Sequence, residues 1–98
     1  MIKRKNKKFD YNKMKEFFLQ CWKEKSHYCE ECKKFLGNEP KTHMFDHLLE
    51  KSKYPELAFE KENIMITCLE CHDKKTRGFL TNLVSEKIKN LKNYYKIT

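Results

Sequence analysis

The 98-residue sequence has little of the two residues that most often form turns, with only two Gly and two Pro. This scarcity argues against a low-complexity chain and against an all-β chain with many tight turns. No apolar run approaches the roughly 20 residues that a membrane-spanning helix needs, so no membrane association is expected. The basic N-terminus, residues 1–8, is followed by no apolar stretch and does not read as a secretory signal. We therefore expect a cytoplasmic protein with a single domain.

Basic residues outnumber acidic ones, and the formal net charge is +8. The charge is unevenly distributed: residues 1–25 sum to +6, residues 26–72 to −3 and residues 73–98 to +5. Two basic flanks suit a polyanionic partner such as nucleic acid, and a mildly acidic centre suits cations. The alternative explanation is a Lys-rich composition that only keeps a small protein soluble.

Four of the five cysteines form two Cys-x-x-Cys pairs, Cys29/Cys32 and Cys68/Cys71. This spacing lets both sulfur atoms of a turn reach one ion, and two such turns complete a tetrahedral zinc site. Without a secretory signal, metal binding is favoured over disulfide bonds, and a structural zinc would stabilise a small core. The alternatives are four reduced thiols, or haem attachment through Cys68-x-x-Cys71-His72, which would leave the first pair unexplained.

Apolar periodicity predicts a helix near each end of the chain. The first covers about residues 10–25, with Asp10 as N-cap, Phe9 and Met14 as a hydrophobic staple, and an aromatic core-facing stripe that starts at Tyr11. Cys21 lies on this stripe and is expected to be a buried free thiol. The last helix covers about residues 81–95.

The middle of the chain is expected to hold two strands and a short helix. The strand candidates are residues 42–46 and 64–67, joined by a long connection with room for a helical turn. The helix is predicted to begin at Cys68, to reach residue 75 or 77, and to end near Gly78.

The order Cys29-x-x-Cys32, Asp46-His47, Asn63, Cys68-x-x-Cys71-His72 resembles the HNH endonucleases of the ββα-metal (His-Me finger) group, over about residues 29–78. Residues 54–59 and 63–68 also look like small phage-type members of that family. The resemblance implies an α+β fold, in which a ββα-metal core is stapled by a four-cysteine zinc site and flanked by N- and C-terminal helices. The expected organisation is a basic flexible arm at residues 1–8 and one nuclease domain over residues 9–98, with the zinc knuckles and core at about residues 27–78.

The resemblance also implies roles for individual residues. Asp46 and His72 would bind one catalytic divalent cation, distinct from the zinc, and His47 would take a proton from the attacking water. Asn63 would orient His47 or brace the intervening loop. A carboxylate with an imidazole accepts Mg²⁺, Mn²⁺ or another first-row ion. Because successive strand residues point to opposite faces, Asp46 and His47 can serve one cleft only at a strand end.

Lys74, Lys75 and Arg77 follow His72 and are expected to contact DNA backbone phosphates, with a solvated helix end as the alternative. No base-reading module is visible, which predicts low sequence specificity and salt-dependent affinity. The leading hypothesis is a metal-dependent endonuclease that nicks DNA, as a monomer or homodimer, with phage packaging or mobile-element machinery as a candidate setting. The alternatives are a non-catalytic zinc module that binds nucleic acid, a toxin-like nuclease, and a component of a larger assembly.

Overall fold

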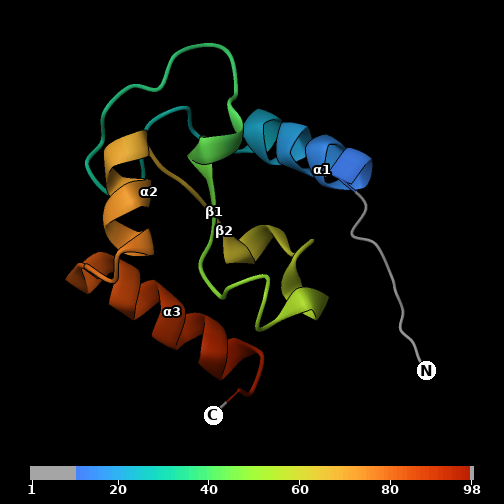
Figure 1. Cartoon of the computed structure of the whole chain (residues 1–98), viewed down its shortest axis with the longest axis vertical. Helices are drawn as coiled ribbons and strands as arrows, with labels where there is room; N and C mark the ends of the chain where they lie inside the picture. The colour runs from blue at the N-terminus through green and yellow to red at the C-terminus, as the bar shows by residue number, and fades with distance from the viewer. Residues whose placement is uncertain (1–10, 98) are drawn as a thin grey trace.

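A computed structural model of the chain describes residues 11–97. Within this range the chain forms three helices and a two-stranded antiparallel sheet (Figure 1), which confirms the expected α+β class. No helix in the described part is long and apolar enough to cross a membrane. The elements in chain order are α1 (Tyr11–Glu24), β1 (Phe45–His47), β2 (Ile64–Ile66), α2 (Leu69–Thr76) and α3 (Asn82–Tyr94).

The small sheet lies at the centre of the fold, between α1 and α3 (Figure 1). Alternate side chains of β2 point to opposite sides, as expected for a strand. Ile64 and Ile66 belong to the buried apolar cluster that contains Trp22 of α1, whereas Met65 belongs to the cluster that contains Val84 of α3. Apolar contacts on both faces therefore fix the position of the strands. The register pairs Phe45 with Ile66, Asp46 with Met65 and His47 with Ile64.

The helix boundaries agree with the sequence signals wherever the structure describes them. Thr81 caps α3, because its side chain accepts a hydrogen bond from the backbone N–H of Val84. Gly78 follows α2 with a φ of 91°, the left-handed conformation expected just after a helix. The predicted N-cap Asp10, the staple residue Phe9 and the arm at residues 1–8 lie outside the described residues.

The core face of α1 differs from the expected stripe at one end. Cys21 is fully buried, as predicted, and burial raises the pKa of its thiol. Tyr11, by contrast, is 71% exposed. It occupies the first turn of α1, beyond the part of the helix that packs on the sheet, so the assignment of Tyr11 to the core is wrong.

The first strand begins later than predicted. Thr42–Met44 form one turn of 3-10 helix, in which the Met44 N–H donates to the Lys41 carbonyl. The turn uses the Met44 N–H and the Thr42 carbonyl locally, and only the Met44 carbonyl, which accepts from the Thr67 N–H, bonds across to the segment after β2, so residues 42–44 are not part of the strand. The strand starts at Phe45 and ends at His47. The long connection to β2 contains two further 3-10 turns, Pro55–Leu57 and Lys61–Asn63.

Candidate metal centres and active site

The four paired cysteines come together in one cluster. Their sulfur atoms all lie within 4.8 Å of one another, and the Sγ atoms of Cys32 and Cys68 are 3.7 Å apart. A tetrahedral zinc with Zn–S bonds of about 2.3 Å holds its sulfur ligands about 3.8 Å apart, so the observed separation fits. Cys29, Cys32, Cys68 and Cys71 are therefore positioned to bind a metal, and four thiolates are a donor set typical of structural zinc.

Both cysteine pairs are shaped by backbone N–H groups that point at sulfur. In the first pair the Cys32 N–H donates to Cys29 Sγ over 3.4 Å, and Lys33 closes the turn with a φ of 70°. In the second pair Cys68 is the N-cap of α2, and its Sγ accepts from the Cys71 N–H over 3.5 Å. Each turn thus presents its sulfur atoms in the arrangement that a shared ion needs.

The thiols of the cluster differ in how readily they ionise. Burial opposes ionisation of Cys29, but backbone N–H groups, first that of Cys32, lower its pKa to about 7. Burial, together with hydrogen bonds to the neighbouring thiols, raises the pKa of Cys71 well above the ordinary value. The Cys29 thiolate therefore forms near neutral pH, whereas ionisation of Cys71 requires a cation that compensates its charge.

A second candidate centre lies where β1 meets α2. Asp46 Oδ1 is 3.6 Å from His72 Nδ1. Asp46 Oδ2 and His72 Nδ1 are buried atoms that lack a hydrogen-bond partner among the described residues, which is uncommon for buried polar atoms. Two atoms that each bind one ion at about 2.1 Å are at most about 4.2 Å apart, so 3.6 Å suits a shared divalent cation.

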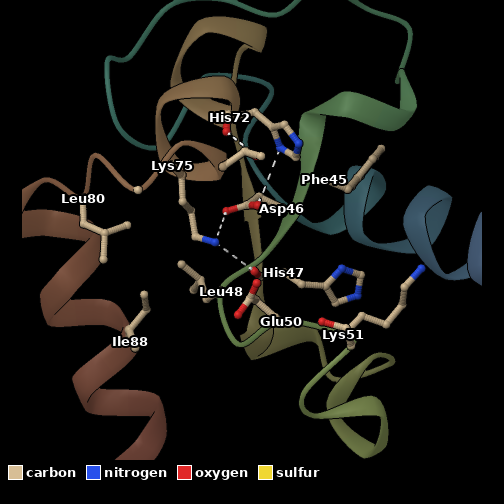
Figure 2. A pocket seen from close by; sticks show the side chains of 13 residues that line it. Phe45, Asp46, His47, Leu48, Glu50, Lys51, His72, Lys75, Leu80 and Ile88 are labelled. Atoms are coloured by element: carbon tan, nitrogen blue, oxygen red, sulfur yellow. Dashed lines mark hydrogen bonds and ion pairs between the residues drawn. The ribbon is translucent and has the colours of Figure 1, made fainter.

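Lys75 reaches the same carboxylate from the next turn of α2. Its Nζ lies 3.3 Å from Asp46 Oδ2, a distance suited to an ion pair although the hydrogen-bond geometry is poor. The same ammonium donates to the His47 carbonyl over 3.2 Å. Figure 2 shows the Asp46 carboxylate between His72 and Lys75. Burial raises the pKa of Asp46, and the adjacent charges of Lys75 and His72 oppose that rise.

The His47 side chain diverges from Asp46 in Figure 2, although both residues line the same cavity. This is the arrangement expected at a strand end, since His47 is the last residue of β1. Its Nε2 lies 3.0 Å from the Ala58 carbonyl oxygen, which only accepts, so Nε2 carries the proton. Burial lowers the pKa of His47. The ring is therefore neutral at pH 7, with a lone pair on Nδ1.

Asn63 lies beneath this site and is completely buried. Its Oδ1 accepts from the Leu49 N–H over 2.7 Å, and its Nδ2 donates to the carbonyls of Leu49 and Leu57 over 3.0 and 3.2 Å. These bonds tie together the connection that carries Ala58, the partner of His47. Bonds of this kind are those that a brace of the loop would make, which keeps that role for Asn63 as the prediction.

The cavity beside the centre is open to solvent and has a volume of about 600 Å³. Asp46, His47 and His72 line it, together with side chains from the loop after β1 and from α3.

The three basic residues predicted to contact DNA differ in their surroundings. Lys74 and Arg77 are exposed, and Arg77 pairs with Asp73 over 3.2 Å. Lys75 is only 12% exposed and lies in the centre itself.

Two contacts of the site were not predicted from the sequence. The pairing of Lys75 with Asp46 could have been predicted, because Lys75 lies three residues after His72 and therefore on the same face of the predicted helix. The contact between His47 and the Ala58 carbonyl could not have been, since it depends on the path of an irregular connection.

The fold and the site define a protein with a ββα arrangement, a cluster of four cysteines and an Asp-His pair at a strand end, whose aspartate faces a helix histidine. The family model described as HNH endonuclease matches residues 29–78. The chain therefore belongs to the HNH endonuclease family, whose domains act on nucleic acid with divalent metals. Searches of the curated proteins and of the solved structures gave no match.

Proposed function

We propose that the protein is a metal-dependent endonuclease that hydrolyses DNA phosphodiester bonds. The observation that carries the proposal is the juxtaposition of Asp46 Oδ1 and His72 Nδ1 at 3.6 Å beside the neutral imidazole of His47. Asp46 and His72 would hold one divalent cation, with Mg²⁺ or Mn²⁺ as the preferred ions. When bound, this cation supplies positive charge to the scissile phosphate and to the leaving oxygen.

His47 acts as the general base in this proposal. Its Nε2–H is held by the Ala58 carbonyl, so Nδ1 accepts the proton from a water molecule. The hydroxide attacks phosphorus, the bond to the 3′-oxygen breaks, and the leaving 3′-oxygen takes a proton from solvent water. The expected products are 5′-phosphate and 3′-hydroxyl ends, as the family resemblance implies. Asn63 contributes indirectly, because it fixes the connection that presents Ala58 to His47.

The surrounding charge favours a DNA backbone as the substrate. Lys74 and Arg77 are exposed on and just beyond α2, on the helix that carries His72, and we assign them to phosphate contacts. Lys75, the third basic residue of this stretch, contacts Asp46 and belongs to the metal centre. One site per chain cuts one strand, so nicking with low sequence specificity is the expected activity. The cluster of four cysteines is assigned to a structural zinc.

A plasmid-nicking assay tests the proposal. Zinc-loaded wild-type protein with Mg²⁺ or Mn²⁺ should convert supercoiled plasmid to the open circle, and His47→Ala should lose this activity by at least about 100-fold. His27→Gln is the matched control, because His27 stacks on Trp22 away from the site and its glutamine can still donate to the Trp22 carbonyl. Equal nicking by wild type and a folded His47→Ala would refute His47 as base. If wild type binds DNA but neither it nor any variant nicks the plasmid, the protein is instead a non-catalytic zinc module.

A further inference from the structure

Lys75 is placed unlike the other lysine of α2. The side chain of Lys75 is only 12% exposed, and its ammonium contacts both a carboxylate oxygen and a backbone carbonyl. Lys74, the preceding residue, is exposed to solvent. Burying an ammonium is costly unless it is paired, so the position of Lys75 depends on the negative charge of Asp46.

The two oxygens of Asp46 face different partners. Oδ1 faces His72, and Oδ2 faces Lys75 (Figure 2). Because His72 and Lys75 are three residues apart on α2, both approach the carboxylate from the same helix face. A divalent cation held by Oδ1 and His72 would therefore have a positive charge on the far side of its only carboxylate ligand.

The cavity as a whole has equal numbers of acidic and basic side chains in its lining. Its lining contains two carboxylates, Asp46 and Glu50, and two amines, Lys51 and Lys75. The carboxylates and the ammonium groups of the lining therefore cancel, and such a cavity attracts a divalent cation only weakly. A DNA phosphate that enters the cavity would supply the missing negative charge.

We infer that Lys75 neutralises Asp46, so that the divalent cation is recruited together with the DNA phosphate and is not held beforehand. This inference rests on the proposed endonuclease function and assigns Lys75 as a positioning residue that acts through Asp46. Cation and DNA then bind with positive coupling, and each raises the affinity of the site for the other. The metal site is complete only when substrate is present.

The first test is a Mn²⁺ titration without DNA at about pH 8. The electron paramagnetic resonance signal of free Mn²⁺ measures how much of the ion remains unbound. Zinc-loaded Lys75→Met should bind Mn²⁺ at least about tenfold more tightly than wild type, since one positive charge has left the site. Lys75→Gln also removes the positive charge but keeps an N–H donor for the His47 carbonyl, and it should show the same gain in Mn²⁺ affinity. It replaces Lys75→Met in this test if the methionine variant fails to fold. Lys75→Arg, and the control Lys89→Met at an exposed lysine of α3, should keep the Mn²⁺ dissociation constant within about threefold of that of wild type.

The second test adds DNA in a His47→Ala background, which prevents cleavage. A short duplex should lower the Mn²⁺ dissociation constant of His47→Ala at least about tenfold. In His47→Ala with Lys75→Met the duplex should lower it by a clearly smaller factor, because the carboxylate is already free to hold the ion. Retention of the full DNA effect in the double variant would contradict the inference.

The outcomes separate this inference from the proposed function. If Lys75→Met and Lys75→Gln bind Mn²⁺ no more tightly than wild type, while wild type binds Mn²⁺ and nicks plasmid, only the role of Lys75 is wrong. If no variant binds Mn²⁺ with or without DNA, the Asp46–His72 metal site is wrong, and both proposals fall. Tighter binding by both charge-removing variants, with a reduced DNA effect, supports the inference.

Discussion

Replacement of Asn63 by Ala tests whether the asparagine of the HNH series braces the fold or takes part in the chemistry. The change removes three buried hydrogen bonds and leaves the N–H and the carbonyl of Leu49 without partners, whereas the Leu57 carbonyl still accepts from the Glu60 N–H. A buried group left unsatisfied costs about 1–3 kcal/mol, so the two groups of Leu49 should lower the unfolding free energy by at least about 2 kcal/mol. For a domain of this size each kcal/mol shifts the melting temperature by about 4–8 °C, which predicts a drop of at least about 8 °C.

Thermal unfolding of the zinc-loaded protein, followed by circular dichroism, measures this drop. Asn63→Asp should be similarly unstable, because a carboxylate would face the two carbonyls to which the amide now donates. Asn90→Ala, on the exposed side of α3, is the matched control and should change the melting temperature by less than about 3 °C. If Asn63→Ala melts within about 3 °C of wild type yet has lost nicking activity, the bracing role is refuted.

Two other predictions concern the zinc cluster and the general base. Cys29→Ser should lose zinc, measured by elemental analysis, and should unfold at physiological temperature, because zinc binding supplies much of the folding free energy of small domains; an unchanged melt with no bound zinc would contradict this. Burial lowers the pKa of His47, so the base stays unprotonated to below pH 6.5. A plot of log kcat/KM against pH should therefore rise with unit slope on the acidic side and level off with a midpoint below pH 6.5. A midpoint above pH 6.5 would argue against His47 as the general base.

The helices were predictable because their signals are local. The apolar stripe of α1, the Thr81 cap and Gly78 each act within a few residues of their own position. The start of β1 was not predictable, since Thr42–Met44 have strand-forming residues but a 3-10 turn competes for their backbone. The exposure of Tyr11 was hidden for a similar reason: periodicity identifies a face of a helix but not how far the neighbouring sheet extends.

The sequence predicted which residues form the candidate site better than it predicted the contacts that they make. The order of Asp46, His47, Asn63 and His72 pointed to one cleft, and the structure brings Asp46 and His72 to 3.6 Å. The detailed bonds of Asn63 depend on the fold of residues 48–62, which carry no periodic pattern. A sequence therefore indicates which side chains meet, whereas the proton position on His47 follows only from the carbonyl that the loop supplies.

The four-cysteine cluster and the candidate active site share α2, and this would link folding to function. Cys68 caps α2 and Cys71 lies in its first turn, so the metal that binds the cysteines would fix the start of that helix. His72 is the next residue, and its distance from Asp46 is set by where α2 begins and how it is rotated. A shift of the helix by one residue would rotate His72 by about 100° and remove it from Asp46. With a metal bound, the cysteines would therefore do more than stabilise a small core: they would set the register of the helix that carries His72 of the candidate active site.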